Sequence, residues 1–320
     1  MKKLLAVVCA VLMMVSLTAC GGAAPAEEGK YTVGICQLVT HDALDAATNG
    51  FMDALKDELG EENVSFNLQN AAGDTNTCST IMNAFVSENV DLIMANATPA
   101  LQAAQAATAD IPVLGTSVTE YGVALDLDNF VDTVGGNISG TSDLAPLDQQ
   151  AAMLQEWFPD AKNVALLYCS AEANSKYQVD TVKALLEDLG YTCELFAFAD
   201  SNDMAAVTQG ACDFADVIYV PTDNAIASGT DVIDGICRPA GVPIIAGEEG
   251  SCAGCGVATL SISYYDQGYT TGKMAAQILT GEADISTMPI GYAENFTPKY
   301  NPDICADLGL TPPEGYEPIG

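Results

Sequence analysis

The sequence predicts an α/β protein of two doubly wound parallel-sheet lobes with a ligand cleft between them. Short apolar runs alternate with longer amphipathic stretches along most of the 320 residues, and this alternation is typical of parallel strands joined by covering helices. The alternation continues through four units, breaks at a polar, glycine-rich segment at 135–146, and begins again. Two similar series around a polar break indicate two lobes.

Each lobe is assigned its own series of strands. The first series is predicted at 31–36, 64–68, 91–94 and 112–115, and the second at 163–168, 193–198, 216–220, 242–246 and 256–262. A helix at 264–281 would bring the chain back to the first lobe. We therefore assign 30–138 with about 264–290 to an N-terminal lobe, and 139–263 with about 291–320 to a C-terminal lobe.

The first residues predict export. Lys2 and Lys3 precede an apolar run at 4–15, as in a secretory signal peptide, which we assign to 1–19. The ending Leu-Thr-Ala-Cys-Gly resembles the bacterial lipobox, so Cys20 is expected to carry a diacylglycerol; an ordinary signal peptide is the alternative. Residues 20–29 would form a flexible tether, holding the protein on the outer face of the bacterial cell membrane.

The net charge of the chain excludes or disfavours several classes of binding partner. The chain carries a formal net charge of −33 with 49% hydrophobic residues, which describes a folded core under an acidic surface. Nucleic-acid binding needs a basic surface and is excluded. Anionic lipids and highly anionic substrates are disfavoured in the same way, so contact with the membrane is expected only through the lipid anchor.

The cysteines and the sole histidine suggest chemistry that the spacing does not support. Cys36 and His41 are five residues apart, and Cys36 ends a strand that should be buried, so a Cys–His nucleophile is a poor interpretation. Cys252-Ala-Gly-Cys255 lacks the second CxxC of a zinc site, which leaves a local disulfide or two thiols. We expect no enzyme activity, no metal and no cofactor.

Polar loops follow nearly every predicted strand. Examples are QLVTHD after the first strand and PTDNA after the seventh. Any single loop of this composition is explained by helix N-capping. All eight would converge at the carboxyl ends of the strands, where open α/β sheets bind ligands, and this favours a binding cleft.

These loops carry motifs of a known family. The motifs are Q-x-x-x-H-x-A-L-D-A (37–46), N-A-x-G-D (70–74), A-N-A-T-P-A (95–100), V-T (118–119), G-G-N-x-S-G-x-S-D (135–143), L-L-Y-x-x-x-E-x-N-S-x-x-Q (166–178) and P-T-D-N (221–224). Together they resemble the tryptophan/tyrosine-type substrate-binding lipoproteins of ABC transporters, of the type I periplasmic-binding-protein fold, over residues 31 to about 310. Asp42, Glu120-Tyr121 and Cys169 depart from the family pattern at the cleft.

The resemblance implies a monomer that captures a small solute, an aromatic amino acid, and delivers it to an ABC permease and its ATPase. The ligand's carboxylate would be held by hydroxyl and N–H donors and its ammonium by Asp223 with Asn224, or by Asp143 as second choice. An aromatic ligand would stack on Tyr121, Tyr177, Tyr219 or Tyr264. Ligand contacts are predicted at Gln37, His41, Asp45, Thr98, Ser117, Thr119, Ser139, Thr141, Asp143, Asn174, Ser175, Gln178, Asp223 and Asn224.

Two alternatives stay open. The same scaffold also serves binding proteins for other amino acids, sugars or nucleosides, and sensors that signal to a membrane receptor. Sugar sites of this fold combine stacked aromatics with Arg–Asp pairs, whereas this chain has one tryptophan, Trp157, and one arginine, Arg238.

Overall fold

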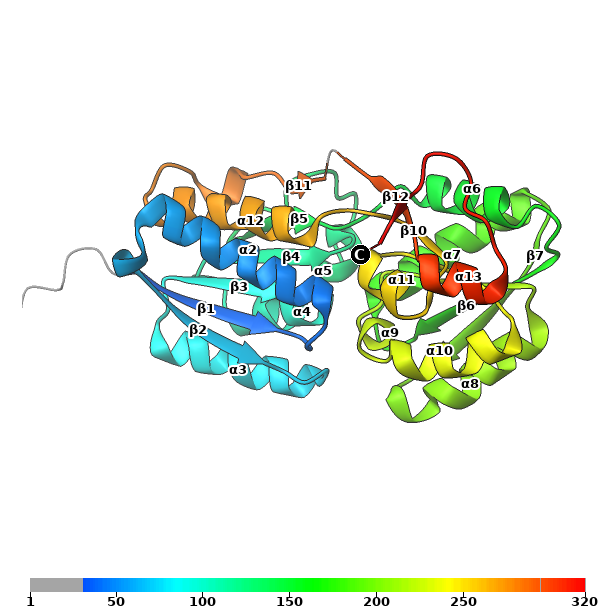
Figure 1. Cartoon of the computed structure of the whole chain (residues 1–320). Helices are drawn as coiled ribbons and strands as arrows, with labels where there is room; N and C mark the ends of the chain where they lie inside the picture. Colours follow the sequence, from blue (N-terminus) through cyan, green and yellow to red (C-terminus); the bar gives the residue numbers. More distant parts are fainter. Residues whose placement is uncertain (1–30, 294, 320) are drawn as a thin grey trace, which may run out of the picture. The chain divides into compact units, whose positions relative to one another are not determined.

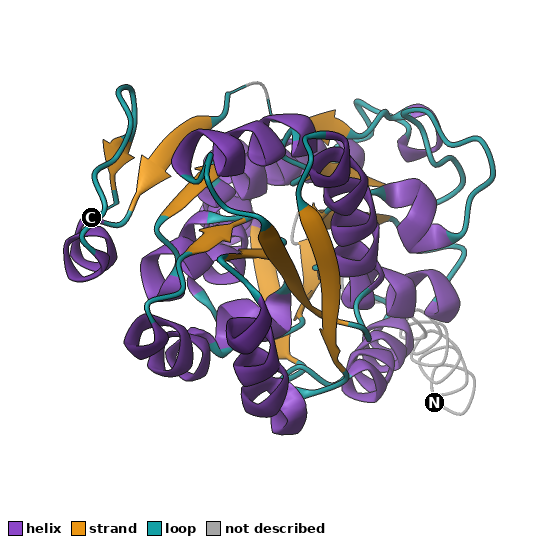
Figure 2. Cartoon of the chain, turned by 90° about the vertical axis from the view of Figure 1, so that its right-hand side faces the viewer, coloured by secondary structure: helices purple, strands orange, loops and turns teal. Residues whose placement is uncertain are grey.

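The computed structural model describes residues 31–293 and 295–319. The predicted signal peptide, Cys20 and the whole of the predicted tether lie outside these residues. Within the described part of the chain, the strands form two sheets with helices on both faces (Figures 1 and 2). The predicted α/β fold of two parallel-sheet lobes is confirmed.

The first sheet has the strand order β11-β5-β4-β3-β1-β2, and its paired strands are parallel. Its strands are β1 (Tyr31–Gln37), β2 (Val64–Asn70), β3 (Leu92–Asn96), β4 (Val113–Val118), β5 (Ile138–Ser142) and β11 (Gly291–Tyr292). Its helices are α2 (Asp42–Leu59), α3 (Thr75–Glu88), α4 (Thr98–Ala107), α5 (Tyr121–Leu125) and α12 (Tyr264–Leu279), with 3-10 turns η1 (Glu61–Asn63) and η2 (Ile285–Thr287).

The second sheet has the order β13-β12-β10-β9-β8-β6-β7, in which β10 and β12 are the antiparallel pair. Its strands are β6 (Asn163–Cys169), β7 (Thr192–Phe198), β8 (Val217–Val220), β9 (Ile244–Ala246), β10 (Ala258–Ser261), β12 (Thr297–Tyr300) and β13 (Glu317–Pro318). Its helices are α6 (Leu147–Trp157), α7 (Ala173–Asp188), α8 (Ser201–Phe214), α9 (Asn224–Ser228), α10 (Thr230–Ala240), α11 (Glu249–Cys255) and α13 (Pro302–Leu308).

Both sheets repeat one doubly wound topology. In each, the second strand lies outside the first, and the third, fourth and fifth follow on the other side: β2-β1-β3-β4-β5 and β7-β6-β8-β9-β10. The connection reverses direction between β1 and β3, and again between β6 and β8. Ligands of such sheets bind beyond the carboxyl ends of the strands at these switch points, which locates the regions where a site is expected.

The core explains why the strands read as continuous apolar runs. On one face of the first sheet, Phe51 and Leu55 of α2 pack with Ala275 of α12; on the other face lie Phe85 of α3 and Leu101 of α4, all fully buried. A fully buried large apolar side chain contributes about 1.5–3 kcal/mol. Figure 1 shows α2 and α12 side by side over one face of this sheet, with α3 on the other.

Helices α2 and α12 touch through glycines. A Cβ atom at Gly268 would lie 2.0 Å from the Ala47 carbonyl oxygen, and one at Gly50 would lie 2.1 Å from that of Tyr265. No side chain fits at such separations, so the glycines allow the two backbones to approach. This contact fixes α12, which returns from the second lobe, against the first sheet.

One boundary prediction was wrong. Strand β5 belongs to the first sheet, paired with β4, whereas the predicted lobe boundary lies at residue 138, within the polar segment 135–146. Strand β11 likewise pairs with β5, although residues from 291 onward were given to the second lobe. The polar strand was missed because its buried hydroxyls are paired internally, as when Ser139 Oγ donates to the Met288 carbonyl.

No helix in the described ranges has the length and apolar character needed to cross a membrane.

Candidate functional site

A small cavity lies where the carboxyl ends of the two sheets meet. It has a volume of about 280 Å³, and the centre of a water molecule can occupy only about 10 Å³ of it. Its lining comes from elements of both lobes: His41, Ala43, Leu44, Ser117, Thr119, Asp143, Asn174, Thr222, Asp223, Asn224, Ala227, Glu248 and Tyr264. Seven of the fourteen predicted contacts therefore lie together around one space.

Hydrogen bonds close this cavity by joining the lobes. The His41 Nε2 atom lies 3.3 Å from Asn224 Oδ1, and Gln178 Nε2 donates to Thr119 Oγ1 at 3.4 Å. His41 and Thr119 belong to the first lobe, and their partners follow β8 or lie on α7 of the second. These hydrogen bonds join the two lobes on either side of the cavity.

Three buried polar atoms at this cavity lack hydrogen-bond partners among the described residues. They are Ser117 Oγ, Asp143 Oδ1 and Asn174 Oδ1, on side chains that are each at least nine-tenths buried. An unpaired buried polar group costs about 1–3 kcal/mol, and buried polar groups in folded proteins are normally paired. Their convergence on one space indicates a site built to bind polar atoms of a ligand.

The amino end of α2 adds donors to the same cavity. Its N-cap residue, His41, makes no side-chain cap, and Ala43 and Leu44 of its first turn line the space. The first backbone N–H groups of a helix have no intrahelical acceptor, and the helix dipole favours an anion there. This end of the cavity is therefore suited to a carboxylate.

Ser117 is held toward the cavity by an irregular backbone. Its φ is 53°, in the left-handed region, and the β4–β5 register shifts between Gly115 and Val118. A bulge of this kind redirects a side chain, and a non-glycine residue in this region is strained by about 1–3 kcal/mol. Such an outlier beside unpaired polar groups supports a binding role.

Asp143 is the acidic residue of the lining with a carboxylate oxygen that has no hydrogen-bond partner among the described residues. Burial raises the pKa of this carboxyl to about 6, and the nearby Glu248 acts in the same direction, whereas the neighbouring Thr119 and Tyr264 hydroxyls lower the pKa. The Tyr264 hydroxyl donates to Oδ2 at 3.1 Å, while Oδ1 is the oxygen without a partner. A positively charged group at Oδ1 would stabilise the ionised form.

Both carboxylate oxygens of Asp223, the residue that the sequence favoured for the ligand's ammonium, already accept backbone hydrogen bonds. Its Oδ1 accepts from the Ile226 N–H at 2.9 Å, as the cap of α9, and its Oδ2 accepts from the Cys169 N–H at 2.7 Å. Burial raises the pKa values of Asp223 and of the neighbouring Glu172, that of Glu172 to about 7. Asp223 therefore shapes the cavity wall, whereas Asp143 has the freer oxygen.

The other predicted residues lie outside the cavity lining. Gln37 Nε2 donates to Oδ1 of Asp45, on α2, at 2.6 Å. Thr141 belongs to a hydroxyl network with Thr116 and Thr271. The remaining four are buried: Thr98, Ser139, Ser175 and Gln178.

Gln178 stands directly behind the wall. Its amide donates to the Thr222 carbonyl at 3.1 Å and accepts from the Thr222 N–H at the same distance. Thr222 and Glu248, which do line the cavity, were not predicted. Both lie in loops that the sequence had marked as facing the cleft, but loop composition does not show which side chain turns inward.

Of the four tyrosines proposed for stacking, Tyr264 lines the cavity. Tyr121 and Tyr219 are fully buried in the cores, and the Tyr219 hydroxyl donates to Gln150 Oε1 at 2.6 Å. Tyr177 is partly buried beside the second core.

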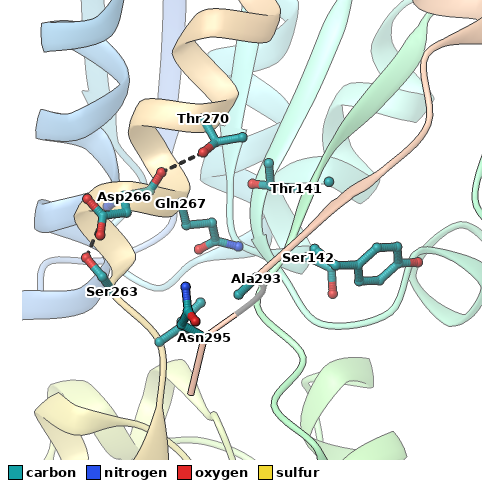
Figure 3. Close-up of a pocket in the computed structure, with 11 residues that line it drawn as sticks. Thr141, Ser142, Ser263, Asp266, Gln267, Thr270, Ala293 and Asn295 are labelled. Carbon is teal, nitrogen blue, oxygen red and sulfur yellow. Dashed lines mark hydrogen bonds between the residues drawn. The ribbon is translucent and has the colours of Figure 1, made fainter. Parts of the chain in front are cut away.

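A second, larger cavity lies beside the segments that cross between the lobes. Its volume is about 840 Å³, and Figure 3 shows Gln267 of α12 reaching into it, with Thr141 and Asn295 on the facing side. Neither amide atom of Gln267 has a partner among the described residues. The cavity shares only Thr141 with the predicted contacts, so it is not the site that the sequence located.

The geometry favours neither a Cys36–His41 nucleophile nor a metal site. Cys36 is fully buried in β1, beside the equally buried Cys78. Among the described residues, no three His, Cys, Asp or Glu side chains are placed to hold a metal ion.

A cavity between two doubly wound lobes, lined by unpaired polar atoms, defines a binding protein for a small solute. A family model described as ABC transporter substrate binding protein matches residues 32–316, and the chain belongs to this family. Its members bind small solutes for ABC transporters outside the cytoplasm and are not enzymes. The type I periplasmic-binding-protein fold is confirmed.

Two similar proteins of this family have names or structures that state a ligand. A tyrosine-binding protein of Clostridioides difficile (strain R20291) is 35% identical over 302 residues, which are 90% of this chain and 87% of the relative. An ABC domain from Streptococcus pneumoniae, solved in complex with L-Trp, is 32% identical with a TM-score of 0.86, over 91% of this chain and 100% of that one.

A third relative was solved in a different state. The ligand-free, open structure of a substrate-binding protein with adhesive properties from Clostridium difficile is 36% identical, with a TM-score of 0.68, over 90% of this chain and 99% of that one. The TM-score of this chain is higher with the L-Trp complex, at 0.86, than with the ligand-free, open structure, at 0.68.

Proposed function

We propose that this protein captures an aromatic amino acid, tryptophan, tyrosine or phenylalanine, by closing its two lobes around it. The observation that carries the proposal is the convergence of unpaired Ser117, Asp143 and Asn174 oxygen atoms on one cavity beside the amino end of α2. The tyrosine-binding and L-Trp-bound relatives support the same ligand class.

The polar ends of an α-amino acid match the two ends of the cavity. The ammonium group would bind Asp143 Oδ1 and Asn174 Oδ1, since both atoms accept hydrogen bonds and one is charged. The carboxylate would bind the free N–H groups of α2 and the Ser117 hydroxyl. The lining contains no Lys or Arg, so a second carboxylate on the ligand would be repelled by Glu248 and Asp223.

The ligand side chain would lie against His41 and Tyr264. The centre of a water molecule can occupy only about 10 Å³ of the cavity, about the space of one water, so the cavity would widen by movement of the lobes to admit an amino acid. Opening would occur about the three segments that cross between the lobes, near 138–143, 258–264 and 288–294. Contacts made from both lobes would then stabilise the closed form.

Delivery and anchoring complete the proposal. The protein would be a monomer, lipidated at Cys20 on the outer face of the cell membrane, that hands its solute to an ABC permease driven by an ATPase. Support comes from the sequence of the first thirty residues and from the family. A neighbouring gene for a permease would favour transport, and one for a receptor kinase would favour the sensor alternative.

A thermal-shift panel on residues 21–320 tests the ligand class. The panel contains tyrosine, tryptophan, phenylalanine, other amino acids, sugars and nucleosides. A ligand at about 100 times its dissociation constant adds about 2.7 kcal/mol of stability, and we expect this only with aromatic amino acids. A shift with a sugar or nucleoside alone would support the second candidate and reject the assignment of the cavity.

A further inference from the structure

Two cysteines of the second lobe are in direct contact. Cys212 of α8 and Cys237 of α10 have their Sγ atoms 3.2 Å apart. Cys237 is 1% exposed within the apolar cluster beneath these helices, and Cys212 is half-buried at its edge. A disulfide needs the two sulfur atoms at about 2.05 Å, so a small side-chain movement would bring them to bonding distance.

We propose that Cys212 and Cys237 form a disulfide in the exported protein, and that this bond braces the cleft segment of the second lobe. The bond would close residues 213–236 into a loop. That loop contains β8 and the residues that follow it, Thr222, Asp223 and Asn224, which line the ligand cavity. Closing a loop removes conformational freedom from the unfolded chain.

The chemistry is an ordinary thiol–disulfide exchange with a small-molecule or enzyme disulfide of the extracytoplasmic space. The hydrogen bond with Cys237 lowers the pKa of Cys212, which makes the more accessible sulfur also the better nucleophile. Its thiolate attacks one sulfur of the oxidant and releases a thiolate. The Cys237 thiol then loses its proton and attacks Cys212, releasing the second thiolate. Two cysteines are oxidised, and one disulfide is reduced to two thiols.

The other cysteine pairs are worse placed. Cys252 and Cys255 both lie on α11, where residues three apart have Cβ atoms about 5–6 Å apart, beyond the 3.5–4.5 Å of a disulfide. The Cys255 thiol instead donates to the Ser251 carbonyl. Cys36 and Cys78 are neighbours but are both fully buried, so no oxidant reaches them in the folded protein.

Peptide mapping tests the proposal. The purified, reduced protein is incubated with glutathione disulfide at neutral pH and then alkylated under denaturing conditions, so that buried thiols also react. It is cut without reduction by a protease that cleaves after acidic residues, because Asp216 and Asp223 separate the two cysteines. We expect a linked pair of peptides carrying Cys212 and Cys237, with Cys36, Cys78 and Cys252 alkylated. Alkylation of both Cys212 and Cys237, or a stable glutathione adduct on Cys212, would overturn the proposal.

Hydrogen exchange tests the bracing. Oxidation should raise the melting temperature and slow amide exchange in 216–228, and reduction should reverse both effects. The variant Cys212→Ser should show neither change, whereas the control Cys252→Ser should behave as the wild type. Unchanged exchange in 216–228 despite a mapped disulfide would reject the bracing role.

Discussion

Replacing Asp143 by Asn should make the ligand-free protein more stable and should lower its affinity for the ligand. The pKa of Asp143 is about 6 because the carboxyl is buried beside Glu248, whereas an ordinary Asp has a pKa of about 3.9. A difference of about two pKa units corresponds to about 3 kcal/mol. The native protein holds this proton more tightly than the unfolded chain does. The stability from this group is therefore complete below pH about 4 and lost as the pH rises through about 6.

Asparagine keeps the shape and still accepts from Tyr264, but it carries no charge to bury. At about pH 8, Asp143→Asn should therefore gain up to about 3 kcal/mol, or about 6 °C in melting temperature, and the gain should vanish below about pH 4. Affinity for the aromatic amino acid should fall about 10- to 150-fold, since a hydrogen bond to a charged group is worth about 1.5–3 kcal/mol.

Denaturation curves across this pH range and calorimetric titrations measure the two effects. The control is Asp188→Asn, the same change on an exposed acid at the end of α7, which should stay within about 0.5 kcal/mol of the wild type. A less stable Asp143→Asn at about pH 8, or one with unchanged affinity, would refute the role given to this carboxylate.

Three further predictions follow from the same geometry. Affinity for the amino acid should fall as the pH drops below about 6, because the ligand's ammonium needs Asp143 ionised; affinity independent of pH between about 7 and 5, measured by titration calorimetry, would contradict this. Asp223→Ala should lower the free energy of unfolding by about 2–4 kcal/mol in chemical denaturation, because a helix cap is lost and a buried N–H is left unpaired. Asp223→Asn should keep the cap and change the affinity for the amino acid less than about threefold. Gly268→Ala should destabilise by about 1–3 kcal/mol or more by forcing α2 and α12 apart, while Gly235→Ala, in open space on α10, should stabilise by up to about 1 kcal/mol in the same assay.

The sequence was sufficient for the parallel strands because burial on both faces leaves an apolar run for each. All nine predicted strands are present, with ends that differ by up to three residues. Strand β5 was missed because Ser139, Thr141 and Ser142 are buried with hydroxyl partners inside the protein. A polar strand of this kind carries no apolar signal, and only the tertiary contacts show that it is a strand.

The site was predictable as a region but not as a set of side chains. Loop composition at the carboxyl ends of the strands led to His41, Asp143 and Asn174. It also led to Gln37, whose amide turns to Asp45 beneath α2, because the direction of a side chain depends on its local partners. The preference for Asp223 over Asp143 could not be resolved from the sequence, since two backbone N–H groups occupy Asp223 only in the folded chain.

Calorimetric titration with an amino acid and its deaminated analogue tests the central claim most directly. L-Tyrosine and desaminotyrosine, or L-tryptophan and its deaminated acid, differ in the ammonium group that Asp143 and Asn174 are proposed to hold. We predict saturable binding of the amino acid and an affinity at least about tenfold lower for the analogue. Equal affinities would show that the carboxylate and amide oxygens at the cavity do not recognise the ligand's ammonium, and would contradict the account.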